Sequence, residues 1–151
     1  MTPGLNMKLQ NIQYNIDKLR EEEGVDFAAI AFCEHSSTYS PIKWQYVSGN
    51  NNDRYKLIVL RKGRGLAGNV MKTGKRMLIS NVDMALSPDE KVKYPILLSE
   101  SLTAVIAVPL CFNNQVYGVI LFGQRNHKPL PDNIENIIIN ERLGELKEDI
   151  R

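Results

Sequence analysis

The first apolar pattern along the chain predicts an amphipathic helix over residues 1–24. Leucine and isoleucine recur there at spacings of four and three, which places their side chains along one side of a helix. Gly24 follows the charged end of this segment, where glycine commonly ends a helix because it tolerates a positive φ. The members of the apolar stripe are Leu5, Leu9, Ile12, Ile16 and Leu19.

The patterns that follow predict strands. Residues 27–33 are continuously apolar and too short for a surface helix, which favours a buried strand. Residues 42–48 alternate and contain aromatic side chains, so we expect them to form a hairpin with the first strand. Residues 102–112 and 115–124 predict a second, longer hairpin, because the two asparagines between them can adopt the positive φ of a tight turn.

Short elements lie between the two hairpins. Residues 55–60 are ambiguous between strand and helix, since a short apolar run shows no period. The sequence Gly63-Arg64-Gly65 predicts the start of a helix that ends at Gly74, and residues 77–80 predict a short strand.

A second short helix is predicted to begin after Ser87. Ser87 is placed to cap it, Pro88 suits its first position, and Glu90 suits its third. Pro95 disfavours helical backbone at the residue before it, so this helix is expected to be brief. The apolar segment 94–98 is then expected to be a loop.

The chain closes with a predicted helix over residues 132–151, capped by Asp132. The whole pattern predicts an α+β fold in one domain, residues 1–151. A central, mostly antiparallel sheet would carry the two terminal helices on one face. Short helices and loops on the other face would enclose a ligand pocket. The apolar side of the last helix consists of Ile134, Ile138, Leu143, Leu146 and Ile150.

Composition narrows the classes of partner. The formal net charge is only +2, which is too small a positive field for nucleic-acid binding. No segment is apolar over the roughly 18 residues that a membrane span requires, and the start lacks a signal-peptide pattern. We therefore expect a cytoplasmic protein without nucleic-acid or membrane partners.

The candidate catalytic and metal-binding residues are few. Cys33 and Cys111 lie in apolar strand-like runs, where we expect buried core residues rather than a disulfide or a catalytic pair. His35 and His127 lack the spacing of metal ligands. Neither a catalytic residue nor a metal site is expected.

Three features converge on the predicted ligand layer. The segment 63–68 is rich in glycine and opens a helix whose first amides lack partners, which makes a potential anion site. Trp44 carries an indole N–H that needs an acceptor when it is buried. The amide of Ile96, in the apolar segment after Pro95, can also point inward. Taken singly, each feature is explained at least as well by core packing.

Several motifs resemble those of GAF domains over essentially the whole chain. The resemblance implies the α+β fold described above and a domain that binds a small ligand. The matching segments are Gly65-Leu66-Ala67-Gly68 with Thr73-Gly74-Lys75, Leu78-Ile79-Ser80-Asn81, the strand 101–110, and Tyr117-Gly118-Val119-Ile120-Leu121.

Within this family the chain resembles stand-alone nitrate receptors. That resemblance implies a sensor that binds nitrate, needs no cofactor, catalyses no reaction, and regulates a sensor histidine kinase of a two-component system. It also implies that nitrate accepts hydrogen bonds from the Trp44 indole and from the amides of Leu66, Ala67 and Ile96. Leu60, Tyr94 and Pro95 would line the pocket.

Three alternatives stay open. The first is an enzyme such as the GAF-type free methionine sulfoxide reductases, although no cysteine lies between residues 87 and 107, where that family's pair is expected. The second is a GAF module for another ligand, such as a cyclic nucleotide, a bilin or haem; for haem, His35 is the only faint axial candidate. The third is a purely structural or dimerisation module, because the four-three spacing of the first helix is that of a coiled-coil seam and suggests a homodimer.

Overall fold

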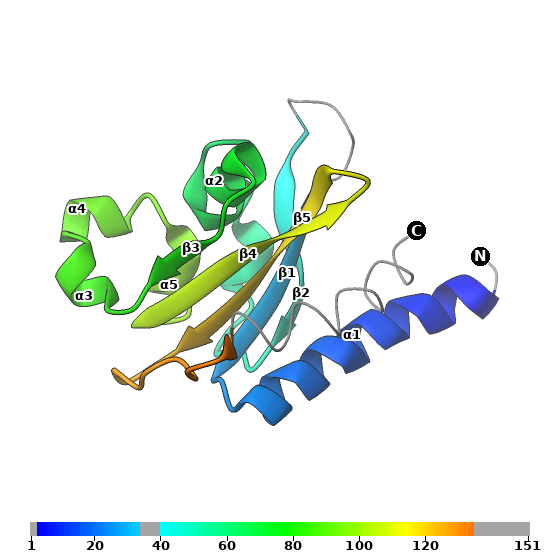
Figure 1. Ribbon diagram of the computed structural model, residues 1–151, viewed down its shortest axis with the longest axis horizontal. Helices are drawn as coiled ribbons and strands as arrows, with labels where there is room; N and C mark the ends of the chain where they lie inside the picture. The colour runs from blue at the N-terminus through cyan, green and yellow to red at the C-terminus, as the bar shows by residue number, and fades with distance from the viewer. Residues whose placement is uncertain (1–2, 34–39, 135–151) are drawn as a thin grey trace.

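A five-stranded antiparallel sheet divides the protein into two apolar layers (Figure 1). In this computed structural model the described residues are 3–33 and 40–134, with side chains described from residue 11. The spatial order of the strands is β2-β1-β5-β4-β3. Their bounds are β1 Phe27–Cys33, β2 Ile42–Ser48, β3 Met77–Ile79, β4 Ala104–Phe112 and β5 Gln115–Gln124. The predicted fold class and both hairpins are confirmed.

The central strands are buried on both faces. In β1, Phe27, Ala29 and Ala31 face one layer, whereas Ala28 and Ile30 face the other. A strand with two buried faces needs no polar positions, which explains the continuous apolar run. The turn between β4 and β5 is also as predicted, because Asn113 and Asn114 both have positive φ.

Helix α1 (Pro3–Glu23) covers one face of the sheet. Ile12, Ile16 and Leu19 from its stripe are buried there, and Gly24 ends the helix with φ +70°. The side chains of Leu5 and Leu9 lie outside the described residues, as does most of the predicted helix 132–151. None of the helices in the described ranges is long and apolar enough to cross a membrane.

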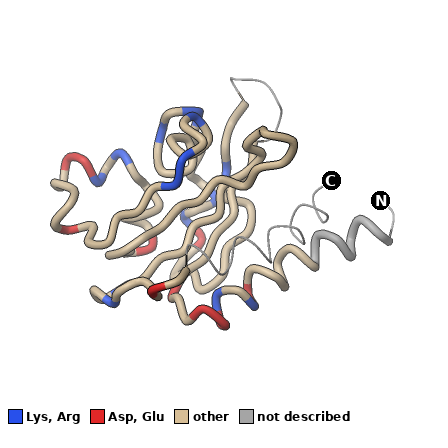
Figure 2. The backbone as a smooth tube through the Cα atoms, viewed as in Figure 1, with Lys and Arg blue, Asp and Glu red and all other residues tan. Residues whose placement is uncertain are grey.

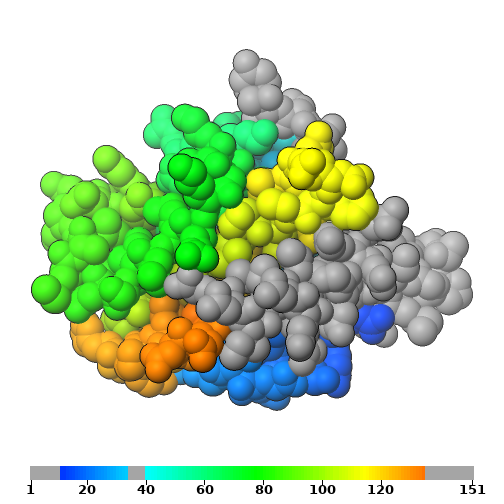
Figure 3. Space-filling model, in the orientation of Figure 1, coloured from blue at the N-terminus to red at the C-terminus, as the bar shows by residue number. Residues whose placement is uncertain are grey.

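Five short helical segments lie on the other side of the sheet, with α2 packed on its face and α3 and α4 beyond β3 at its edge (Figures 1 and 3). The capping box of α4 is confirmed: the Ser87 hydroxyl accepts the Glu90 N–H at 3.3 Å, and the Glu90 carboxylate accepts the Ser87 N–H at 3.0 Å. The segments are the 3-10 helix η1 Arg54–Leu57, α2 Gly65–Thr73, α3 Val82–Ala85, α4 Pro88–Lys91 and α5 Pro95–Ser99.

Two parts of this layer differ from the sequence expectation. The segment 94–98 is mostly helix, not loop: α4 ends at Lys91, and Pro95 occupies the first position of a new helix, α5. The fixed φ of proline suits a helix start, and proline keeps the residue before it, Tyr94, out of the helix. Helix α3 was not anticipated, and it is capped by the Asn81 side chain, which accepts the Met84 N–H at 3.2 Å.

Candidate functional site

Trp44 lies in β2 and faces the layer of short helices. It is only 3% exposed, and its indole Nε1 has no hydrogen-bond partner among the residues that the structure describes. Indole can donate one hydrogen bond and accept none. A buried N–H without an acceptor costs roughly 1–3 kcal/mol. This donor is therefore available to an acceptor that comes from outside the described chain.

The orientation of Trp44 depends on an irregularity in β2. Ala31 pairs with Trp44, whereas the preceding Ile30 pairs with Tyr46, so Gln45 has no direct partner. Such a bulge reverses the alternation of side chains across a sheet. As a result, Trp44 faces the short helices and Tyr46 packs in the layer beneath α1. Small residues of β1, Ala29 and Ala31, lie in the same cluster as the indole.

The first turn of α2 supplies a second set of donors. Gly65 starts the helix with φ +67°, and no side chain of its N-cap residue bonds to the first amides. Leu66 and Ala67 are buried in this turn. The first amides of a helix have no intrahelical acceptor, and the helix dipole adds partial positive charge there. The turn can therefore hold a negatively charged or strongly accepting group.

Glycine is required at position 68, in the first turns of α2. A Cβ atom on Gly68 would lie 2.2 Å from the carbonyl oxygen of Arg61, so the backbone of the loop fits only against glycine. The Gly63 N–H donates to the Gly68 carbonyl at 2.8 Å, which closes the loop on the helix. The glycine spacing noted in the sequence thus builds the start of α2.

Helix α5 supplies the third donor. Ile96 is buried in its first turn, behind Pro95, which has no N–H of its own. The Leu97 N–H donates to the Tyr94 carbonyl at 3.0 Å, whereas the N-cap side chain of Tyr94 bonds to none of the first amides. Tyr94 and Pro95 are half-buried, and the ring of Tyr94 packs against the cluster that contains Trp44.

Leu60 links β2 to the start of α2. Its backbone forms a bridge with Ile42, in which each N–H donates to the other carbonyl at 2.8 and 2.9 Å. Its side chain lies against Gly65, since a Cβ on that glycine would be 2.8 Å from Leu60 Cδ2. The ambiguous segment 55–60 is thus a 3-10 turn followed by an isolated bridge.

The structure brings the sequence-predicted residues into one layer. The buried members share a single apolar cluster, and the donors that it offers are neutral N–H groups. That these residues contact a ligand stays a prediction. Of the predicted site residues, the members of this larger cluster are Trp44, Leu60, Leu66, Ala67 and Ile96, and Tyr94 packs against it.

The charge around this layer is uneven (Figure 2). Between Asp53 and Asp83 the sequence contains no acidic residue, and Lys and Arg positions lie along the backbone around α2 and the segment that leads to β3. A field of one sign raises the local concentration of small ions of the opposite sign. The surface near α2 therefore favours anions.

The cysteines do not behave as the sequence suggested. Cys33 is half-buried, with its Sγ 3.9 Å from Met71 Sδ, and burial raises the pKa of its thiol although Lys62 partly opposes this. Cys111 is exposed, so the expectation that both are buried is wrong for this residue. It stands near the end of the β4–β5 hairpin, just before the turn at Asn113.

The predictions about histidine and metal are tested only in part. His35 lies outside the described residues. His127 is exposed, and its Nε2 lies 3.6 Å from Asp83 Oδ2. Within the described ranges, no group of three or more His, Cys, Asp and Glu side chains is placed to hold a metal ion.

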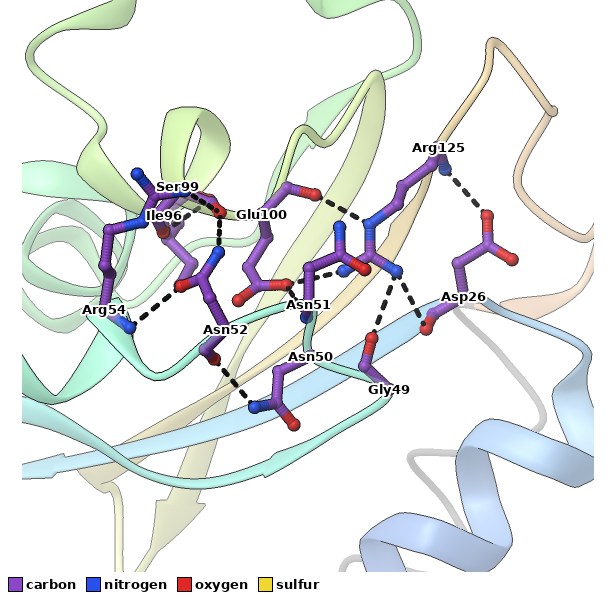
Figure 4. Close-up of polar contacts among 10 residues, drawn as sticks. All are labelled: Asp26, Gly49, Asn50, Asn51, Asn52, Arg54, Ile96, Ser99, Glu100 and Arg125. Atoms are coloured by element: carbon purple, nitrogen blue, oxygen red, sulfur yellow. Dashed lines mark hydrogen bonds and ion pairs between the residues drawn. The ribbon is translucent and has the colours of Figure 1, made fainter.

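One buried polar cluster gave no signal in the sequence. Glu100 is fully buried and pairs with Arg125 at 2.6 Å beside the end of α5 (Figure 4). The two residues are far apart in the chain, and a single Glu and a single Arg in mixed segments carry no pattern. Only their proximity in the folded chain reveals the pair.

Comparison with solved structures finds close relatives. NreA from Staphylococcus aureus, mutated in its nitrate binding site, is 66% identical over 86% of this chain and 94% of that chain, with a TM-score of 0.83. A hypothetical protein from S. aureus is 70% identical over 80% of this chain and 98% of that chain, with a TM-score of 0.78.

More distant structures share the fold alone. A free methionine-R-sulfoxide reductase from Neisseria meningitidis is 18% identical over 94% of this chain and 77% of that chain, with a TM-score of 0.69. The comparison with curated proteins found no match. The family model of the GAF domain matches residues 15–137, and the chain therefore belongs to the GAF domain family.

Proposed function

We propose that this protein is a nitrate-binding sensor domain that regulates a sensor histidine kinase in the cytoplasm. The observation that carries the proposal is the buried indole N–H of Trp44, which has no partner in the described chain. It lies in the same cluster as the first turns of α2 and α5, where Leu66, Ala67 and Ile96 have buried positions.

The chemistry of these donors suits nitrate. The ion is small and planar, with one charge spread over three acceptor oxygens, and neutral N–H groups can surround its edge. Each hydrogen bond to a charged group contributes about 1.5–3 kcal/mol net of the exchange with water. A helix N-terminus adds about 0.3–2 kcal/mol. Three or four such contacts support a micromolar dissociation constant, about −8 kcal/mol.

The relatives support the same ligand. NreA from S. aureus has a nitrate binding site, and it is 66% identical to this chain. Regulation of a histidine kinase is implied by the family resemblance of the sequence. The reductase alternative would need a pair of cysteines in one site. Cys33 is half-buried in the ligand layer whereas Cys111 is exposed near the hairpin turn, so their environments favour a receptor over a reductase.

The site is tested by calorimetric titration of the purified protein with sodium nitrate, against sodium chloride at equal ionic strength. Trp44→Phe keeps an aromatic ring but removes the indole donor. We expect its nitrate dissociation constant to rise by about tenfold or more, the loss of one hydrogen bond to an ion. Absence of nitrate binding by the wild type would refute the proposal, as would equal affinity in Trp44→Phe.

A matched control comes from the same strand. Tyr46→Phe removes a hydroxyl two residues away, on the side of the sheet that faces α1. We expect it to bind nitrate as the wild type does. Chlorate and nitrite, titrated in parallel, show how strictly the site selects the shape of the anion.

The kinase is tested with purified sensor histidine kinases of the same organism. Their autophosphorylation is measured with and without this protein, in the presence and absence of nitrate. The proposal requires one kinase whose activity changes with this protein and changes again when nitrate is added. The proposed regulation is contradicted if this protein changes kinase autophosphorylation equally with and without nitrate, or if none of these kinases responds to it.

We also propose a homodimer from the spacing of the first helix. Ile12, Ile16 and Leu19 of this stripe are buried against the sheet of their own subunit, so a second copy would have to contact other positions of the helix. Sedimentation at micromolar concentration distinguishes a dimer from a monomer.

A further inference from the structure

A buried ion pair lies at the end of α5 that is opposite to Ile96 (Figure 4). The side chain of Glu100 is 0% exposed, and its Oε1 accepts hydrogen bonds from Arg125 Nη2 at 2.6 Å and from the Asn51 N–H at 2.7 Å. Its Oε2 has no partner among the described residues. The negative charge of this carboxylate is therefore balanced by Arg125.

Arg125 joins the ends of three strands to this helix. Its Nε–H donates to the Glu100 carbonyl at 2.7 Å, and its Nη1 donates to the Gly49 carbonyl at 3.1 Å. The backbone N–H of Arg125 donates to Asp26 Oδ2 at 2.8 Å, and the guanidinium lies 5.7 Å from the centre of the Phe27 ring. One side chain thus ties α5 to the start of β1, the end of β2 and the end of β5.

The same end of α5 is held by the turn after β2. The Ser99 carbonyl accepts Asn52 Nδ2 at 2.7 Å and Arg54 Nη2 at 3.4 Å. Inside the helix, the Glu100 N–H donates to the Ile96 carbonyl at 3.2 Å. A helix of five residues has little stability of its own. Its position therefore depends on these contacts.

We propose that Glu100 and Arg125 are positioning residues for the anion site. By fixing the end of α5 they fix the Ile96 N–H, which lies about 6 Å away along the helix at a rise of about 1.5 Å per residue. A hydrogen bond tolerates only a few tenths of an ångström in length. A small shift of α5 therefore removes the contact between Ile96 and the anion. This inference rests on the proposed function.

The alternative is that the pair only stabilises the fold, and a neighbouring residue separates the two roles. Gln124 is also buried and also joins distant segments: its Oε1 accepts the Asp26 N–H at 2.9 Å, and its Nε2 donates to the Pro129 carbonyl at 3.1 Å. The hydrogen bonds of its side chain lead to Gly24, Asp26 and Pro129, none of which lies in α5. Gln124→Met is therefore the control for general loss of stability.

The test uses two variants of the pair. The double variant Glu100→Gln with Arg125→Gln removes both charges together, so that neither is left buried without its counter-charge. Arg125→Lys keeps the ion pair but loses the Nε–H bond to the Glu100 carbonyl. We expect the double variant to weaken nitrate binding by about tenfold or more, as for one lost hydrogen bond, and Arg125→Lys by less.

A second readout reports on α5 without ligand. Hydrogen exchange of the Leu97 and Glu100 amides is measured in the wild type, both pair variants and Gln124→Met. Both amides donate within or next to α5. In the double variant, the exchange rates of these two amides should increase more than those of β1 amides in the same protein. In Gln124→Met, the α5 and β1 amides should change by the same factor. If the double variant does not fold, Arg125→Lys carries both measurements.

The inference is overturned if the pair variants lose no more affinity than Gln124→Met. It is also overturned if affinity falls while α5 exchanges in step with β1, because the loss would then not come through the helix. These results leave nitrate binding by the wild type intact, so they refute the positioning role alone. If the wild type binds no nitrate, the proposed function and this inference fall together.

Discussion

Gly65 and Leu60 approach so closely that a Cβ atom on the glycine would lie 2.8 Å from Leu60 Cδ2. Gly65 also has φ +67°, a conformation that other residues rarely adopt. The backbone of Leu60 is held by its bridge with Ile42, so any relief of this contact must come from the Leu60 side chain or from a shift of Gly65. The start of α2 is thus fixed against the segment that follows η1.

Gly65→Ala should therefore damage both stability and binding. The positive φ costs about 1–2 kcal/mol for a residue with a Cβ, and the contact with Leu60 adds to it. Because the shift falls on the turn that contains Leu66 and Ala67, we expect nitrate affinity to decrease as well. Urea denaturation and calorimetric titration measure the two effects.

Gly24→Ala is the matched control. Gly24 has φ +70°, and nothing lies within 4 Å of the Cβ that alanine would add. Gly24→Ala should lose only the part of the free energy of unfolding that the positive φ costs, and it should keep the nitrate affinity of the wild type. If the two variants lose the same stability and the same affinity, the contact with Leu60 does not matter.

Nitrate affinity should be nearly independent of pH between 6 and 8. The proposed donors are an indole N–H and backbone amides, and these groups do not titrate in that range. Titrations at pH 6, 7 and 8 should give dissociation constants within about twofold, since a coupled proton would change them about tenfold per unit. A steep slope would indicate a titrating group in the site.

Asp26 should contribute to stability at neutral pH and lose this contribution in acid. Burial raises the pKa of its carboxyl, but the hydrogen bond and charge of Lys128 and the Arg125 N–H outweigh this, so the net pKa lies below the usual value. A lowered pKa stabilises the fold above the unfolded pKa of about 3.9. The contribution is lost as pH falls through the lower, folded pKa.

Urea midpoints of the wild type and Asp26→Asn, compared from pH 7 down to pH 2.5, check this sign. The wild type should be more stable at neutral pH, and the difference should shrink only below about pH 4. Lys128→Met should weaken the same dependence, because it removes the main partner of Asp26. A constant difference across the whole range would contradict the assignment.

Cys111 should react with thiol reagents faster than Cys33. Cys111 is exposed, whereas Cys33 is half-buried and burial raises its pKa, which reduces the fraction of reactive thiolate. Reaction with a disulfide reagent near pH 8 should show a fast and a slow phase. Cys111→Ser should remove the fast phase. Loss of the slow phase instead would reverse the assignment.

The sequence alone determined the elements whose signals are local. Glycine and proline mark helix boundaries because of the φ angles that they adopt. The helix ends at Gly24 and Gly74 and the capping box that begins at Ser87 could therefore be predicted. Long apolar runs marked β1, β4 and β5, because strands buried on both faces have few polar positions. The Trp44 indole, the glycine-rich segment 63–68 and the Ile96 amide were singled out from residue type and turn chemistry, whereas Leu66 and Ala67 were named only through the resemblance to nitrate receptors.

The tertiary structure alone decided which way side chains face and which distant residues meet. Nothing in residues 42–48 marks the bulge at Gln45, yet it turns Trp44 and Tyr46 to opposite faces. The Glu100–Arg125 pair, like the exposure of Cys111, depends on where separate segments pack. Register and long-range contact arise from the packing of the whole sheet, whereas a sequence pattern reports only on neighbours along the chain.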